Sequence, residues 1–163
     1  MSSPASIKNH PIHPMLVALP IGLWVFALVC DIVAATGAAG PWRTVAFYAI
    51  AGGIVGAVLA AAPGLIDYFS IKEASMKRIA TFHFMLNVCA LLVFAINLWS
   101  RLRLPTTSVI PLILSIVGVT GIGMGGWLGG EMVYVKGMAV EAVEAVEELG
   151  KKVEERPKLR RVS

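Results

Sequence analysis

Charged residues are scarce in this 163-residue sequence, which has 14 Lys and Arg and 10 Asp and Glu. They make up 15% of the chain, whereas soluble domains have about 25%. Hydrophobic residues reach 57%, against roughly 45–50% in soluble domains, and the mean hydropathy is +0.78. This composition excludes an ordinary water-soluble domain and indicates a protein that folds in a lipid bilayer.

Cysteines are also few, and the sequence lacks the motifs of the common enzymes. Cys30 and Cys89 fall inside apolar runs at different depths, so we expect no disulfide between them. A phosphate-binding loop and a Ser/His/Asp set are both missing, so an enzymatic function is not favoured. The net charge of +4 suits anionic lipid headgroups better than nucleic acid. A signal peptide of the usual form does not precede the first apolar run, which we expect to be a retained helix.

The sequence instead contains four long uncharged runs of 22 to 27 residues. A transmembrane helix needs about 20 mostly apolar residues, so each run is long enough to cross a bilayer. Charged residues bound the four runs as pairs: Lys8 and Asp31, Arg43 and Asp67, Arg78 and Arg101, Arg103 and Glu131.

These runs predict four spans in a transmembrane domain of residues 1–135, at about 15–35, 42–67, 78–99 and 108–128. Short connections make neighbouring spans antiparallel, so the predicted fold is an all-α, up-down-up-down four-helix bundle. Both ends of the domain then lie on one side of the membrane, which we call side A, and the opposite side is side B. Basic residues near the membrane favour side A by five to three, which predicts that the termini are cytoplasmic in a bacterial inner membrane.

The polar tail, residues 136–163, has apolar residues every three or four positions and is predicted to form a short soluble helix. Glycines four residues apart indicate where helices approach closely, with packing inside the bundle as the main interpretation. A homo-oligomer or a flat ligand against these faces are the alternatives. The glycines are Gly52 and Gly56 in the second span, and Gly121, Gly125 and Gly129 in the fourth.

All three histidines fall on side A in this topology. His10 and His13 precede the first span, and His83 lies near the side A end of the third. Two acids end the second and fourth spans on the same side. These acids and two neutral polar residues are candidate supporting groups: Asp67, Glu131, Asn87 and Tyr134.

This cluster is compatible with several functions. Three imidazoles and a carboxylate would make a transition-metal site. Alternatively, His10 or His13 could pair with His83 as the axial ligands of haem b between the helices. A third interpretation is a structural or partner-binding membrane subunit without a cofactor, in which these groups hydrogen-bond to one another. A small transporter is least favoured, because the span centres carry no charge.

At these residues the chain resembles the bacterial domain-of-unknown-function family 2231, predicted four-helix inner-membrane proteins. The resemblance covers about residues 8–140, and its most specific part is His10-Pro11-Ile12-His13-Pro14. It is also carried by Pro20–Gly22, Pro63–Tyr68, His83 with Asn87, and Gly129–Tyr134. The resemblance implies no particular activity, but relatives fused to Rieske or cytochrome modules imply a redox setting and a redox protein as partner. Relatives often carry a histidine after the last tyrosine, where this chain has Lys136.

Overall fold

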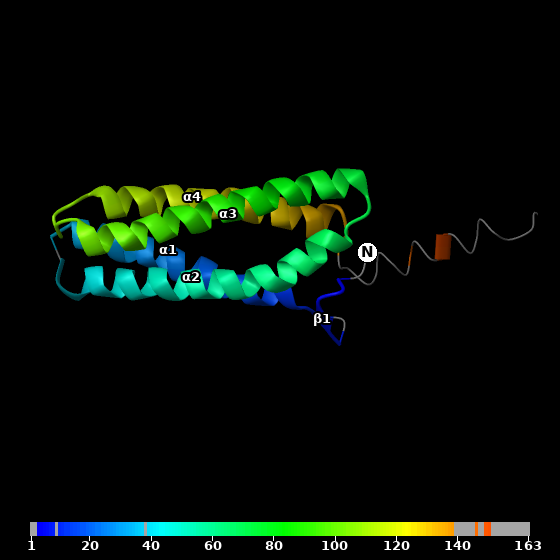
Figure 1. Ribbon diagram of the computed structural model, residues 1–163, viewed down its shortest axis with the longest axis horizontal. Coiled ribbons are helices and arrows are strands. Elements are labelled where there is room, and N and C mark those ends of the chain that lie inside the picture. The colour runs from blue at the N-terminus through cyan, green and yellow to red at the C-terminus, as the bar shows by residue number, and fades with distance from the viewer. Residues whose placement is uncertain (1–2, 9, 38, 139–145, 147–148, 151–163) are drawn as a thin grey trace, which may run out of the picture.

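The computed structural model describes residues 3–8, 10–37, 39–138, 146 and 149–150. Four long helices make up most of this part (Figure 1): α1 (Ile12–Ala35), α2 (Ala39–Ser70), α3 (Ala74–Arg103) and α4 (Ile110–Gly130). Each is long and apolar enough to cross a membrane, with spans at Ile12–Ala35, Trp42–Ser70, Ala74–Arg103 and Ile110–Val135. The prediction of an all-α membrane protein with four spans is confirmed, and its exposed apolar side chains face lipid.

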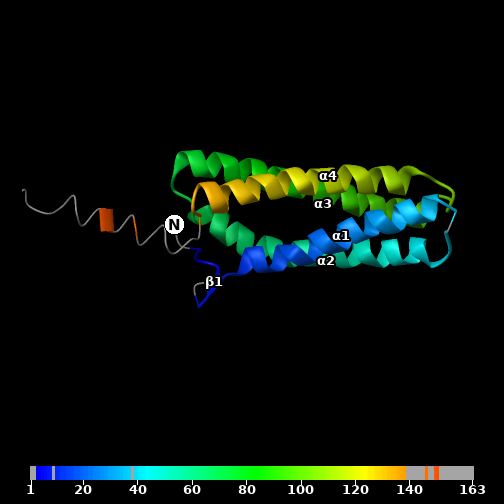
Figure 2. The same cartoon turned by 180° about the vertical axis from the view of Figure 1, so that it is seen from behind.

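The four helices are arranged as two antiparallel hairpins, α1 with α2 and α3 with α4 (Figures 1 and 2). Packing is closer within each hairpin than between them, where α1 meets α4 and α2 meets α3. The N-terminal segment, the α2–α3 connection and the end of α4 lie together at side A (Figure 1).

The helix ends differ in detail from the sequence prediction. Helix α1 begins at Ile12 rather than near Met15, so Pro14 lies in its first turn. The N–H groups of a first turn have no acceptor inside the helix, so proline is tolerated there. Two short strands that we did not predict precede α1: β1 (Ser6–Ile7) and β2 (His10–Pro11).

Helix α4 continues as a π-helical turn, η1 (Glu131–Val135). The tail beyond it, residues 139–145, 147–148 and 151–163, lies outside the described residues. Most of the predicted C-terminal helix falls in this segment, so the helix stays a prediction.

Glu73 caps the start of α3 in the short connection after α2. Its carboxylate accepts hydrogen bonds from the backbone N–H groups of Ser75 and Met76, each at 2.8 Å. The Ser75 side chain and then these N–H groups hold the pKa of Glu73 below its ordinary value. Because the folded-state pKa is lowered, this stabilisation is present at neutral pH and is lost as the pH falls through the folded-state pKa.

Large aromatic side chains that lie over glycines join the two hairpins. Trp24 of α1 lies directly against Gly53 of α2 and stacks on Phe94 of α3, with ring centroids 4.2 Å apart. Phe94 in turn covers Gly118 of α4, where an added Cβ would lie 2.6 Å from the ring. This run of contacts crosses all four helices. The core around it contains small and branched residues: Ala27, Cys30, Ala46, Ala49, Ile50, Ala90 and Ile122.

Replacing Gly118 with alanine should destabilise the bundle, because the new methyl group would overlap Phe94 in a closely packed core. Overpacking of this kind costs about 1–3 kcal/mol in the free energy of unfolding. Gly123→Ala on the same helix is the control, since nothing lies within 4 Å of a Cβ there. Thermal unfolding in detergent would measure both, and equal stability of the two variants would contradict the packing.

Candidate functional site

Two of the three histidines meet between the hairpins. His13 comes from the first turn of α1 and His83 from the side A half of α3. Their ring centroids are 6.3 Å apart and their planes are nearly perpendicular, at 86°. The fold therefore brings together two imidazoles that are 70 positions apart in the sequence and belong to opposite hairpins.

Each histidine ring is hydrogen-bonded to a backbone carbonyl of the other helix in its own hairpin. Nδ1 of His13 lies 2.8 Å from the oxygen of Ala60 in α2, and Nδ1 of His83 lies 2.8 Å from that of Gly125 in α4. A carbonyl oxygen can only accept a hydrogen bond, so each Nδ1 carries the hydrogen and donates it. In the neutral ring the lone pair is then on Nε2. Both rings keep a basic nitrogen that these bonds do not use.

Glycines make the space in which the two rings lie. A Cβ on Gly64 of α2 would lie 2.7 Å from Nδ1 of His13. On Gly129 of α4, it would lie 3.2 Å from Cε1 of His83. The backbone can approach an imidazole this closely only where no side chain is present.

The remaining glycines of the predicted packing faces also lie against side chains of this same chain. Gly125 lies under Asn87, with a Cβ position 2.9 Å from the amide nitrogen, and Gly121 lies against Ala90. In α2, Gly52 contacts Leu23, and Gly56 contacts Leu19 and Pro20. These glycines bring helices close together within each hairpin.

Asn87 packs on the ring of His83 but does not hydrogen-bond to the lone pair on Nε2 of that ring. The amide nitrogen donates to the backbone oxygen of His83 at 2.7 Å. It also lies 3.4 and 3.3 Å from Nδ1 and Nε2 of the ring. Near-equal distances to both ring nitrogens place the amide over the ring face, where it cannot align with an in-plane lone pair.

The other predicted site residues lie apart from this pair. His10 is exposed in the strand pair, with Nδ1 donating to the oxygen of Lys8 at 2.8 Å. Asp67 is buried and accepts hydrogen bonds from the Ser3 hydroxyl at 2.7 Å and the Ala5 backbone N–H at 3.2 Å, so it closes the N-terminal segment onto α2. Glu131 is half-buried at the start of η1, and Tyr134 is 89% exposed.

The predicted three-histidine metal site is therefore not assembled in this structure. Within the described ranges, no group of three or more His, Cys, Asp or Glu side chains could hold a metal ion. His10 is held instead by its own strand pair, whose backbone pairing includes Ile7 with His10. The two-histidine alternative, His13 with His83, is the arrangement that the fold brings together.

The histidine pair lies between two separate apolar clusters. One surrounds Trp24 and Phe94, and the other, nearer the side A end, consists of Ile71, Met76, Ala80 and Met132. Along α2, the buried positions between the clusters are small or polar: Gly53, Gly56, Ala60, Pro63 and Asp67. Among the described residues, α2 thus contributes no large buried apolar side chain between the two clusters. The half-buried Tyr68 of α2 does stack on Phe84 of α3, with ring centroids 5.8 Å apart.

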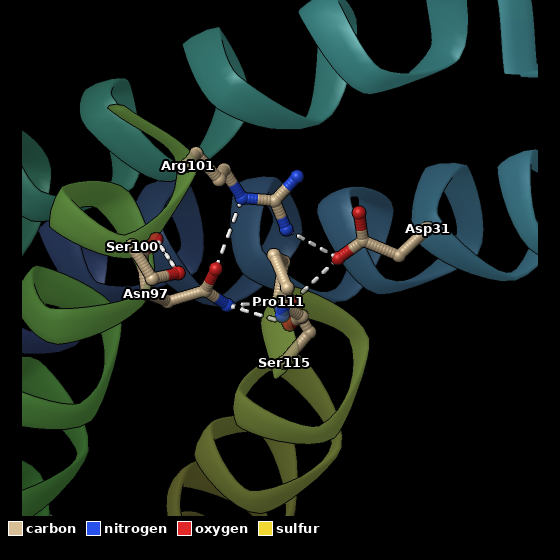
Figure 3. Close-up of polar contacts among 6 residues, drawn as sticks. All are labelled: Asp31, Asn97, Ser100, Arg101, Pro111 and Ser115. Carbon is tan, nitrogen blue, oxygen red and sulfur yellow. Dashed lines mark hydrogen bonds and ion pairs between the residues drawn. The ribbon is translucent and has the colours of Figure 1, made fainter. Parts of the chain in front are cut away.

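A buried polar network at side B was not predicted (Figure 3). The Asp31 carboxylate on α1 pairs with Arg101 of α3 at 2.6 Å and accepts the Ser115 hydroxyl of α4, also at 2.6 Å. Asn97 completes the network by donating to Ser115 at 2.8 Å and accepting from Nε of Arg101 at 2.9 Å. Asn97 and Ser115 are fully buried.

The sequence held a partial signal for this network. Asp31 is the lone acid near side B, and a carboxylate inside an apolar run requires a partner. Arg101 was available at the same end of the bundle, but the two are 70 residues apart. The helix rotations that aim them at each other are set by the packing of α1 against α2 and α4 and of α3 against α4.

Comparison with protein families matches most of the chain to a family of membrane proteins. The model of a family described as "Predicted membrane protein (DUF2231)" matches residues 9–142. No curated protein and no solved structure matches the chain. The matched region contains all four spans, the histidine pair and the side B network.

Removing the acid of the network should destabilise the fold strongly. Asp31→Ala leaves the Arg101 guanidinium buried without its counter-charge, which costs about 3 kcal/mol or more. Unfolding of the detergent-solubilised variants would measure this. The double variant Asp31→Ala with Arg101→Ala should recover part of the loss, because no unpaired charge remains. Arg103→Ala, an exposed position two residues along, should have little effect, and a loss as large as that of Asp31→Ala would contradict the assignment.

Proposed function

This chain belongs to the DUF2231 family of predicted membrane proteins, and we propose that it binds haem between its two helical hairpins. His13 and His83 would hold its iron. The observation that carries the proposal is the edge-to-face pair of imidazoles from opposite hairpins, with ring centroids 6.3 Å apart and an Nε2 on each ring that the carbonyl hydrogen bonds leave free.

The separation of the rings suits a shared metal. With an imidazole–metal distance of about 2 Å, two rings on opposite sides of one ion have centroids roughly 6 Å apart. Edge-to-face ring contacts fall in the same range, so the donor chemistry is what favours a ligand. Histidine ligands almost always donate their other ring N–H to a carbonyl or carboxylate, as both rings do here to Ala60 and Gly125.

Haem fits this pair better than a bare metal ion. A transition-metal ion held by protein alone requires more ligands than two histidines, and no group of three candidate ligands exists among the described residues. A porphyrin supplies nitrogen ligands of its own, so the protein has to supply only the axial ligands. The buried residues of α2 between the two apolar clusters are small or polar, and this is the level at which a flat group would lie between the hairpins.

Two histidines on the iron would leave no open position for a substrate. We therefore propose electron transfer, with a redox protein as partner, rather than catalysis. The site lies toward side A. We propose that this side is the cytoplasmic side of a bacterial inner membrane, and the five-to-three excess of Lys and Arg near side A supports this.

An absorption spectrum of the full chain, purified in mild detergent with haem supplied during expression, tests the proposal. We expect a Soret band with one iron per chain by elemental analysis. His13→Ala and His83→Ala should each remove or shift the band, because each deletes an axial ligand. His10→Ala is the matched control and should leave the spectrum unchanged, since His10 lies in the strand pair.

The competing function is a structural membrane subunit, in which the histidines only tie helices together. It is supported by the same two hydrogen bonds, which join α1 to α2 and α3 to α4. In that case His83→Ala would lower the melting temperature of a protein that never shows a Soret band. A purified wild-type protein without haem or stoichiometric metal would overturn the haem proposal.

A further inference from the structure

We propose that a groove at side B binds a phosphate-bearing anion. The groove has a volume of about 240 Å³ and lies between the start of α2 and the end of α3. Arg43 and Arg101 line it together with the hydroxyl-bearing side chains of Thr44, Tyr48 and Thr106. It is at the opposite end of the bundle from the histidine pair, so it does not depend on haem binding.

Arg101 is held in place before any ligand arrives. Its Nε donates to Asn97 and its Nη2 to Asp31, at 2.9 and 2.6 Å. The other terminal nitrogen points away from this network (Figure 3) and has no hydrogen-bond partner among the described residues. A guanidinium that is already oriented loses little side-chain entropy on binding, and its fork of N–H donors matches phosphate oxygens.

Arg43 supplies a second positive charge. It lies in the first turn of the α2 span, half-buried, and forms no ion pair within the part of the chain that the structure describes. Asp31 balances one of the two arginines, and the lining of the groove contains no acidic side chain. The groove therefore carries a net positive charge, with hydroxyl donors beside it.

The depth of the groove is that of lipid headgroups. The α2 span begins at Trp42 and the α3 span ends at Arg103, so Arg43 and Arg101 are both within one turn of a helix end. Charged residues at the ends of apolar spans reach the boundary between lipid and water. Trp42 and Trp99 lie at the same boundary, where tryptophan is enriched. A basic pocket between transmembrane helices can hold the phosphate of an anionic lipid headgroup through charge-assisted hydrogen bonds. A free phosphate ester carries the same group and could enter from water.

Native mass spectrometry of the full chain, titrated with phosphatidylglycerol, tests the site. Digalactosyldiacylglycerol, which has no phosphate, is the comparison lipid. Arg43→Gln should weaken phosphatidylglycerol binding on the order of tenfold, because it removes one charge-assisted contact to phosphate. Arg43→Lys should retain part of the affinity. Arg103→Gln is the matched control on α3, exposed and outside the groove lining, and should change the affinity by less than about twofold.

Adding inorganic phosphate separates the two sources of the group. Displacement of the lipid by millimolar phosphate would show that the groove recognises phosphate itself, and a lack of displacement would assign it to a lipid headgroup. Equal phosphatidylglycerol binding by the wild type and Arg43→Gln would overturn the proposal. An equal loss with Arg103→Gln, or for the galactolipid, would overturn it as well.

Discussion

The hydrocarbon core of a bilayer offers no hydrogen-bond partners, so a polar group inside these four spans is costly unless another part of the chain or a bound group satisfies it. This requirement accounts for most of the specific contacts in the structure. His13 and His83 donate to carbonyls of a neighbouring helix, and Asn97 and Ser115 complete a network around Asp31. Each polar group placed in the apolar spans therefore fixes the rotation of its helix about its own axis, which apolar packing alone does not determine.

Glycine is what allows these contacts to form inside the two hairpins. In lipid, helices gain no hydrophobic driving force from association, so close backbone approach and side-chain packing must hold them together. Here large side chains pack against the glycines: Trp24 against Gly53, Phe94 against Gly118, and His13 against Gly64. The pattern of small residues in α2 and α4 therefore complements the large residues in α1 and α3.

The sequence predicts the parts of this structure that bilayer thickness controls. Uncharged runs longer than about 20 residues locate the spans, because charge inside a span is costly. The sequence alone does not predict whether His10 or His13 lies next to His83. His10 and His13 are three positions apart, but the backbone of His10 pairs with Ile7 in the strand pair, whereas His13 is already in α1. The Asp31–Arg101 pair was missed for a related reason, since its formation depends on how α1 is rotated against α3.

The two ends of the bundle join its hairpins by different means. At side B, Asp31 of the first hairpin is bonded directly to Arg101 and Ser115 of the second, and the stacked Trp24 and Phe94 rings lie about two helical turns farther into the bundle. At the histidine level, both Nδ1 hydrogens are used within their own hairpins. Among the described residues, no hydrogen bond of α1 reaches α3 or α4 at this end, although Tyr68 and Thr81 bond across the α2–α3 connection at 3.0 Å. A metal that accepted both Nε2 lone pairs would join α1 directly to α3 at side A, as the Asp31–Arg101 pair does at side B. The site would then stabilise the bundle as well as give it a function.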